Sequence, residues 1–327
     1  MKLVSRGAVW RIVVLLVLLA VPFLYMSRCY CRGKHMMTPP ITSADSLRGH
    51  MQMLAGTIGE RNVNNPVSLR RAAAYIEKTW SNQGYRVERQ VFTADGVECV
   101  NLAVQLNGMD EPGPVIVVGA HYDSVDGCPG ANDNASGVAA LLELSRVFMK
   151  QPHNCAIRFV AFVNEEPPYF QTDLMGSRIY ARACRQRGDD IRAMIALETM
   201  GYYSDALGSQ KYPAAVFKLL YPSRGNFIGF ISNLKSRAVT HRAIASFRAH
   251  TDFPSQYCST FERIPGVGWS DHWAFWREGY PAFMVTDTAP FRYAHYHEAT
   301  DTPDKVNYDA LARVTAGLCP AICELAR

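Results

Sequence analysis

The sequence predicts an α/β fold in which a mostly parallel central sheet carries helices on both faces, with one transmembrane segment ahead of it. Three features of the sequence lead to this prediction. Short apolar runs rich in β-branched residues alternate with longer amphipathic segments, which is the pattern of strands alternating with helices. The run at 115–118 is apolar at every position, as expected for a parallel strand that is buried on both faces. A separate basic and apolar segment occupies the first 35 residues.

Residues 1–35 are predicted to be an N-terminal signal anchor, and residues 36–327 a folded domain. Basic residues precede an apolar run at 12–26, and counting back to Ala8 gives 19 residues, close to the about 20 that span a bilayer. No small-x-small cleavage site follows, because residues 25–28 are bulky or charged, so a retained anchor is favoured over a cleaved signal peptide. We expect the anchor to hold the domain outside the cytoplasm, in the periplasm if the source is bacterial.

The charge distribution argues against nucleic-acid binding. The chain carries a formal charge of +5, but six of its 34 Lys and Arg residues lie in residues 1–35, which contain no Asp or Glu. The rest of the chain therefore has 28 basic residues against 29 acidic ones. A domain with this balance has no overall basic excess with which to attract a polyanion.

The nine cysteines do not form a short CxxC zinc pattern. Cys319 and Cys323 lie four residues apart on a predicted helix, which is an awkward geometry for a disulfide. We expect most of the cysteines to be small buried hydrophobic residues.

Periodicity and turn residues predict the elements of the domain in order. Helices are expected where apolar residues recur at helical spacing, at 43–58, 66–83, 139–149, 174–187, 237–249 and 308–325. Strands are expected in the shorter alternating or fully apolar runs, at 85–93, 98–106, 115–119, 156–163, 191–197 and 281–286.

The stretch from 114 to 144 carries the first part of a predicted metal site. A buried strand there leads to His121 and Asp123, and a loop rich in Gly and Pro then presents Asp133 before a helix begins. Open α/β sheets bind ligands in this position, outside the carboxyl ends of their strands.

Later strand ends supply matching side chains. Glu165 and Glu166 follow the strand at 156–163, Glu198 follows the strand at 191–197, and residues 293–303 read YAHYHEATDTP. A mixture of carboxylates and imidazoles without cysteine suits a catalytic zinc site better than a structural one.

These residues match the requirements of a two-metal site, in which one carboxylate bridges ions about 3.5–4 Å apart. Asp133 is assigned as the bridge, Glu165 as the general base, and Asp123 as the acceptor that fixes the tautomer of His121. The remaining ligands are His121 and Glu198 for one ion, and Glu166 and His297 for the other. Asp271 and His272 are expected either to support the ligands or to be structural, and Trp269 or Tyr296 could form the wall of a pocket.

Five motifs in this order resemble the co-catalytic zinc exopeptidases of metallopeptidase clan MH, the relatives of bacterial leucyl aminopeptidase and glutamate carboxypeptidase. The motifs are HYDS at 121–124, ANDNASG at 131–137, NEEPP with GSR within 164–178, SDHWAF at 270–275 and YHEATDTPDKV at 296–306. The resemblance implies the zinc-dependent exopeptidase (phosphorylase/hydrolase-like) fold for residues 36–327. It also implies the same roles for His121, Asp133, Glu165, Glu166, Glu198 and His297, and it favours His297 over the neighbouring His295.

Three positions depart from the pattern of that family. Glu198 stands where many relatives have aspartate, Asn132 replaces the acid often found before the bridging residue, and Glu298-Ala299 replaces the usual Thr-Pro. The first two leave the ligand set intact, whereas the third could alter the wall on the substrate side.

The predicted function is that of a membrane-anchored di-zinc exopeptidase that hydrolyses peptide bonds, favoured to be an aminopeptidase. Its predicted cofactors are two zinc ions and its partners a peptide substrate and the membrane. Two alternatives remain open: a single-zinc glutaminyl cyclase, and a catalytically silent ectodomain on a peptidase fold. The sequence predicts neither the side-chain preference nor the oligomeric state.

Overall fold

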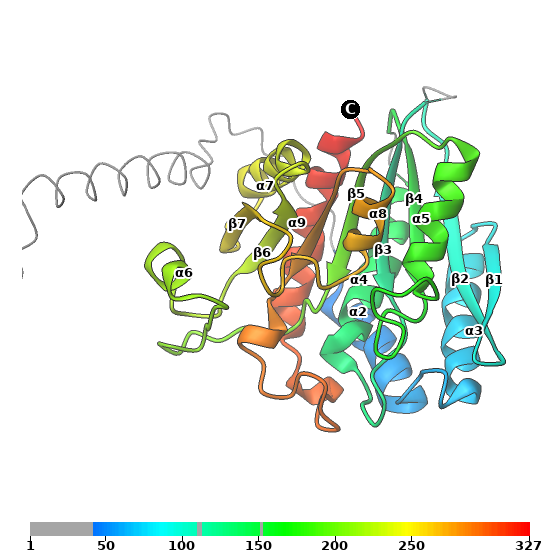
Figure 1. The fold of residues 1–327 in the computed structure, drawn as a ribbon, viewed down its shortest axis with the longest axis horizontal. Coiled ribbons are helices and arrows are strands. Elements are labelled where there is room, and N and C mark those ends of the chain that lie inside the picture. The colour runs from blue at the N-terminus through cyan, green and yellow to red at the C-terminus, as the bar shows by residue number, and fades with distance from the viewer. Residues whose placement is uncertain (1–41, 110–112, 151–152) are drawn as a thin grey trace, which may run out of the picture.

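A computed structural model describes residues 42–109, 113–150 and 153–327 (Figure 1). The strands are β1 (Glu88–Ala94), β2 (Val97–Leu106), β3 (Val115–His121), β4 (Ala156–Phe162), β5 (Ile191–Glu198), β6 (Ile228–Asn233), β7 (Ser255–Thr260) and β8 (Ala282–Thr286). The helices are α2 (Ala44–Met51), α3 (Pro66–Asn82), α4 (Ser136–Phe148), α5 (Gly176–Arg187), α6 (Ala215–Leu220), α7 (Arg237–His250), α8 (His272–Arg277) and α9 (Tyr308–Leu325). Shorter helical turns are η1 (Gln52–Ile58), η2 (Ala131–Ala135), η3 (Ala289–Phe291) and η4 (Pro303–Lys305).

The strands form one mixed, eight-stranded sheet in the order β1-β2-β4-β3-β5-β8-β6-β7. The four central strands β4, β3, β5 and β8 are parallel to one another, and β6 and β7 are parallel as a pair. Antiparallel pairing joins β1 to β2, β2 to β4, and β6 to β8. The parallel centre brings the carboxyl ends of β3, β4 and β5 to the same edge of the sheet, where the predicted site residues lie.

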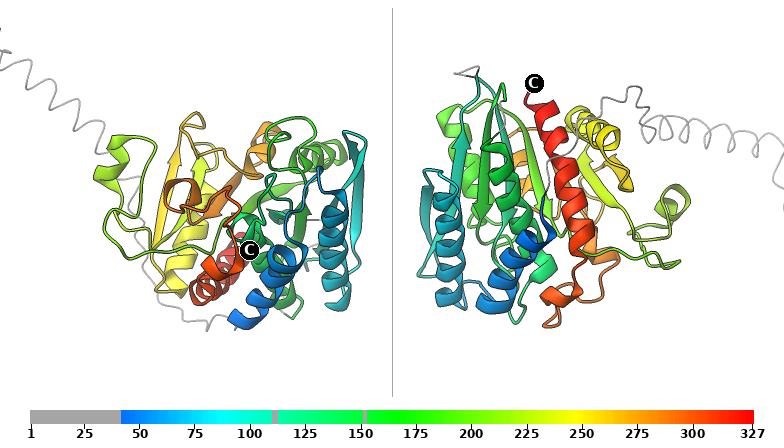
Figure 2. Two further views of the ribbon diagram at one scale, coloured as in Figure 1. Left: turned by 90° about the horizontal axis from the view of Figure 1, so that it is seen from below. Right: turned by 180° about the vertical axis from the view of Figure 1, so that it is seen from behind.

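Two layers of helices cover the sheet, as the sequence predicts for its two faces. Figure 2 shows α2, α3, α4 and α9 on one face, and Figure 1 shows α5 and α8 on the other. Strand β3 explains this arrangement, because its side chains alternate between the two layers. Ile116 and Val118 belong to the core beneath α4 and α9, whereas Val115 and Val117 belong to the core beneath α5 and α8.

The predicted helices and strands are all present, with ends that differ by a few residues. The sequence analysis did not anticipate α6, β6, β7 or α8. The run that forms β6 is short and contains Gly229, and β7 is a polar edge strand, so neither carries a clear periodic signal. Strand β6 is a strand because it pairs with β8, a segment about 50 residues later in the chain. Such a distant contact leaves no local pattern in the sequence.

The structure bears on the prediction for the cysteines but not on that for the N-terminal anchor. The predicted anchor at 1–35 lies outside the described residues, and among the described residues there is no helix with the length and apolar character needed to cross a bilayer. Most of the cysteines that the structure describes are buried, as expected.

Candidate metal centre

Three adjacent strands bring most of the predicted site residues together. His121 is the last residue of β3, Glu198 is the last residue of β5, and Glu165 and Glu166 follow β4. Since β4, β3 and β5 are parallel neighbours, these side chains meet at one edge of the sheet. All four residues are buried.

The loop between β3 and α4 adds Asp133, which lies in η2. Gly137, in the first turn of α4, lets this loop pack closely against the end of β5, because a Cβ there would lie 2.5 Å from the carbonyl oxygen of Leu197. The side chain of Asn134 reinforces the contact by donating to the same oxygen at 2.8 Å. The sequence ANDNASG is therefore folded tightly over the strand end that carries Glu198.

The two carboxylate oxygens of Asp133 face two different histidines. Oδ1 lies 3.2 Å from Nε2 of His121, and Oδ2 lies 3.1 Å from Nε2 of His297. A second carboxylate accompanies each histidine. Glu198 Oε2 lies 3.2 Å from His121 Nε2, and Glu166 Oε2 lies 3.3 Å from His297 Nε2. The five predicted ligands therefore form two clusters that share Asp133.

Several buried polar atoms in these clusters have no hydrogen-bond partner. They are both ring nitrogens of His121, Oδ1 of Asp133, Oε1 of Glu166 and Nε2 of His297. Buried polar atoms are normally paired, so several unpartnered ligand atoms gathered in one place are typical of a cation site. Imidazole and carboxylate donors in this proportion suit zinc. The residues present therefore fit a pair of zinc ions.

The ionisation of the carboxylates reflects the same arrangement. Burial raises the pKa of Glu166 and of Glu198 to about 7, with a further contribution from the nearby Asp133. Burial acts in the same direction on Asp133, but the imidazoles of His121 and His297 outweigh it and hold the pKa of Asp133 below its ordinary value. Asp133 is therefore ionised in this setting, as a bridging ligand must be.

Glu165 lies beside both clusters, and its Oε2 is 3.9 Å from Nε2 of His121. Burial raises the pKa of Glu165 well above its ordinary value. A buried carboxyl with a raised pKa next to a metal centre holds a proton more strongly than a free carboxyl does, which suits a group that accepts a proton and then passes it on.

Asp123 makes different contacts from those expected. Its Oδ1 lies 3.6 Å from Nδ1 of His121, which is longer than a hydrogen bond. Instead, Oδ1 accepts from the backbone N–H of Glu165 at 3.2 Å and Oδ2 accepts from that of Glu166 at 3.1 Å. Asp123 therefore fixes the backbone that carries the two glutamates.

Three further residues support the metal centre, and the sequence did not predict this role for any of them. Asp301 is fully buried and accepts from the backbone N–H groups of Asn132 at 2.9 Å and Asp133 at 3.0 Å. Ser270 donates to Glu198 Oε2 at 2.7 Å. The buried Arg61 donates to the backbone carbonyl groups of Tyr122, Pro129 and Gly130 in the loop after β3. Asp301 and Ser270 lie inside motifs that the sequence analysis identified, whereas no local signal marks Arg61.

A pocket opens directly beside the metal centre. Its empty volume is about 790 Å³, its open mouth included, and Glu198 and Tyr296 lie in its wall. The Tyr296 ring stacks on that of the predicted ligand His297 at 3.9 Å. Most of the other lining residues are aromatic or aliphatic, among them Tyr212, Phe217, Phe227, Ile231, Val267, Trp269, Met284 and Phe291. Among the described residues that line the pocket, Glu198 is the only one with a charged side chain.

Comparison with known proteins is consistent with this geometry. The family model described as Peptidase family M28 matches residues 101–322. "Uncharacterized protein YfbL" of Escherichia coli (strain K12) is 37% identical over 289 residues, which cover 86% of this chain and 88% of that protein. Other curated relatives are matched over 13% to 57% of their own length.

Solved structures with low sequence identity share the fold. BSAP, a zinc aminopeptidase from Bacillus subtilis, has a TM-score of 0.66 and 16% identity, over 88% of this chain and 95% of that chain. The glutaminyl cyclase of Fimbriiglobus ruber has a TM-score of 0.64 and 19% identity, over 91% of this chain and 100% of that chain. The fold alone therefore does not separate hydrolysis from cyclisation.

Proposed function

This chain belongs to peptidase family M28, and from that premise we propose that it is a di-zinc aminopeptidase that removes apolar residues from the amino end of peptides. One observation carries the proposal. Asp133 offers one oxygen to the cluster of His121 and the other to the cluster of His297. A carboxylate shared between two complete ligand sets is the requirement of a two-metal hydrolase, whereas a single-zinc cyclase does not need it.

The chemistry divides between the cofactor and the protein. Two zinc ions, held by His121, Asp133 and Glu198 and by Asp133, Glu166 and His297, would polarise the scissile carbonyl and lower the pKa of the attacking water. Glu165 would take the proton of that water on its carboxylate and later deliver it to the leaving amine. Asp123, through the backbone of Glu165 and Glu166, would keep the base and its neighbouring ligand in position.

The charge of the pocket favours the amino end of a substrate over the carboxyl end. A carboxypeptidase needs a cation to bind the terminal carboxylate of its substrate. No Lys or Arg side chain is among the described residues that line the pocket, and Glu198 is a carboxylate. The aromatic and aliphatic wall would accept an apolar side chain from the first residue of a peptide.

The direct test combines zinc analysis of the purified chain with assays on matched substrates. We expect close to two zinc ions per chain, release of leucine from a leucyl peptide, and no release from the same peptide after N-acetylation. Pyroglutamate formed from an N-terminal glutamine, together with one zinc ion per chain, would favour the cyclase. Two bound zinc ions without turnover of any peptide would favour the silent ectodomain.

The membrane anchor at residues 1–35 remains part of the proposal. A protease-protection experiment on intact membranes tests it. We expect residues 42–327 to be digested only from the extracytoplasmic side, and digestion from the cytoplasmic side would contradict the proposed location.

A further inference from the structure

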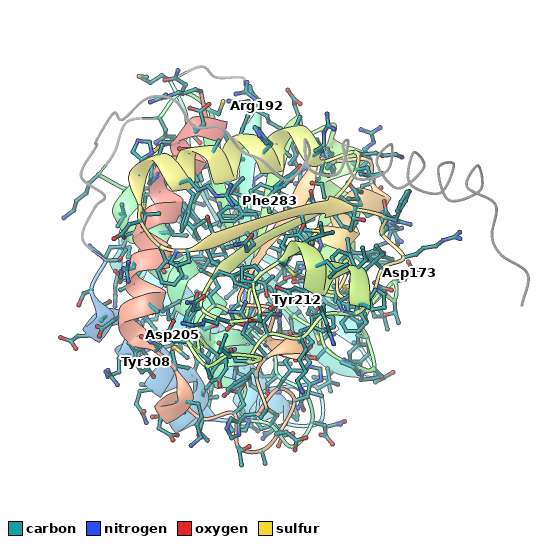
Figure 3. The ribbon with its side chains drawn as sticks, turned by 90° about the vertical axis from the view of Figure 1, so that its left-hand side faces the viewer. Asp173, Arg192, Asp205, Tyr212, Phe283 and Tyr308 are labelled. Carbon is teal, nitrogen blue, oxygen red and sulfur yellow. The ribbon has the colours of Figure 1, made fainter. Side chains whose placement is uncertain are left out.

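A positively charged segment occupies one end of the molecule. Residues 206–251 contain seven Lys and Arg residues and no Asp or Glu, although basic and acidic residues are balanced over residues 36–327 as a whole. The segment includes α6, β6 and α7. In Figure 3 this end of the molecule faces the viewer, with α7 above the outer strands and α6 below them.

Five of the seven cations have no side-chain partner among the residues that the structure describes. The side chains of Arg242 and Arg248 are engaged, by Glu324 and by Ser255. The remaining five are exposed, and their side chains form no hydrogen bond or ion pair with the part of the chain that the structure describes. They are Lys211, Lys218, Arg224, Lys235 and Arg237.

The carboxylates close to this segment are already paired. Asp205 accepts from Asn226 at 2.7 Å, and Asp252 lies 2.9 Å from Arg313. Glu262 is engaged by Arg277 and Asn233. Arg313 and Arg277 therefore neutralise Asp252 and Glu262, whereas Asp205 keeps its charge because its partner is a neutral amide. The five exposed cations remain available to attract an external anion.

Helix α6 also exposes large apolar side chains to solvent. Leu219 is 87% exposed, Val216 53% and Leu220 38%. The buried Phe217 of α6 packs with Tyr212 and Tyr221, and the Tyr221 hydroxyl donates to the backbone carbonyl of Tyr257 in β7, which fixes the helix to the body of the protein. Exposed leucine and valine on a short helix that also carries the exposed Lys218 are typical of surfaces that enter the headgroup layer of a bilayer.

The length of chain before the fold is compatible with this contact. The apolar run of the predicted anchor ends at Met26 and the described fold begins at Thr42, so the intervening 15 residues reach at most about 50 Å. An anchored domain would remain near the bilayer surface, where a weak contact is sufficient for docking.

We propose that α6 and the five exposed cations Lys211, Lys218, Arg224, Lys235 and Arg237 form a docking surface for a bilayer of anionic lipids. The exposed leucines favour a membrane over a nucleic acid, because nucleic acids are bound through phosphate and stacking contacts and not by aliphatic side chains. Docking would also bring the pocket close to the membrane. Phe217 of α6 and the flanking Tyr212 and Tyr221 are part of the pocket wall, so the pocket lies directly beside the proposed docking surface.

Lysine acetylation of the full-length chain on vesicles tests the proposal. The vesicles contain phosphatidylcholine either alone or mixed with phosphatidylglycerol, and mass spectrometry measures the acetylation rate at each lysine. We expect Lys211, Lys218 and Lys235 to be protected severalfold only when phosphatidylglycerol is present. Lys78 is exposed on α3, which covers the other end of the sheet, and serves as the unprotected internal control (Figure 1).

Matched variants separate the two parts of the surface. Lys218→Gln should lower the affinity for phosphatidylglycerol vesicles about fivefold, the effect of one charge near such a surface. Leu219→Glu should abolish the protection of Lys211, whereas Val67→Glu on α3, where Val67 is 58% exposed, should leave it unchanged.

Three results would overturn the proposal. The first is equal acetylation with and without phosphatidylglycerol. The second is unchanged protection in Leu219→Glu. The third is protection that rises with protein concentration in the absence of vesicles, because it would identify a second copy of the chain as the occupant.

Discussion

Asp301 holds Asp133 in place through the main chain, with its Oδ2 accepting the backbone N–H of Asp133 at 3.0 Å. Its Oδ1 accepts from the backbone N–H of Asn132 at 2.9 Å and from the hydroxyl of Tyr293 at 2.7 Å. The bridging carboxylate is therefore positioned by a second carboxylate from a segment that lies about 170 residues later in the chain. This second carboxylate comes from the same loop that carries His297.

Replacing Asp301 should weaken metal binding without removing a ligand. In Asp301→Asn an amide N–H₂ replaces one acceptor oxygen, so one of the two backbone N–H groups loses its partner. We expect zinc affinity to fall about 10- to 100-fold, as is usual for residues that orient a metal ligand. Competition with a zinc chelator measures the change. Asp304→Asn, at an exposed position in the same loop, is the matched control and should bind zinc normally.

Replacing the general base should remove turnover but keep the cofactor. In Glu165→Gln the carboxylate that accepts the proton is gone, whereas the five ligands remain. We expect kcat to fall about 10²- to 10⁴-fold, the usual contribution of a general base. Zinc analysis should still give close to two ions per chain. A variant with normal kcat would show that another group moves the proton.

Removing zinc should destabilise the fold. The metal-free centre keeps four buried carboxyl groups, those of Asp133, Glu165, Glu166 and Glu198, beside two histidines, and several polar atoms of this group have no hydrogen-bond partner. Zinc at about 1,000 times its Kd should stabilise the native state by about 4 kcal/mol. Thermal unfolding with and without a chelator measures this difference. Added zinc should restore the unfolding temperature, whereas magnesium should not, because imidazole ligands disfavour it.

Glu143 should contribute to the loss of stability in acid. It is fully buried on α4 and accepts from Ser46 of α2 at 2.6 Å and from Arg146 at 2.7 Å. Burial by itself would raise the pKa of Glu143, but His50, Arg146 and Ser46 outweigh it and lower this pKa to about 2. The folded-state pKa lies below the unfolded value of about 4.3, so the stabilisation is present above that pH and is lost as the pH falls toward 2.

Denaturant unfolding at several pH values measures the contribution of Glu143. The pKa difference corresponds to a contribution on the order of 3 kcal/mol at neutral pH. We expect Glu143→Gln to be less stable than the native chain at pH 7 and to lose less stability on acidification. The exposed Glu98→Gln is the control and should follow the native curve. Parallel acid curves for the native chain and Glu143→Gln would contradict this account.

Much of the fold followed from local patterns. The β-branched run at 115–118 predicted β3, and the long apolar periodicity at 308–325 predicted α9 with the same ends. Those signals are strong because each residue contributes to one repeating face. Strand β6 gave no such signal, because its conformation depends on β8 and β7 on either side of it.

The sequence by itself determined the chemistry of the candidate site, namely which imidazoles and carboxylates stand at strand ends and in which order. It could do so because the type of ligand and its place after a strand are local properties of the chain. Only the tertiary structure decided how these residues are held. Arg61, Ser270 and Asp301 act through hydrogen bonds to segments between about 60 and 170 residues away. Five exposed cations of residues 206–251 form no ion pair with the part of the chain that the structure describes. Such relationships depend on which distant segments become neighbours, and the sheet order sets this.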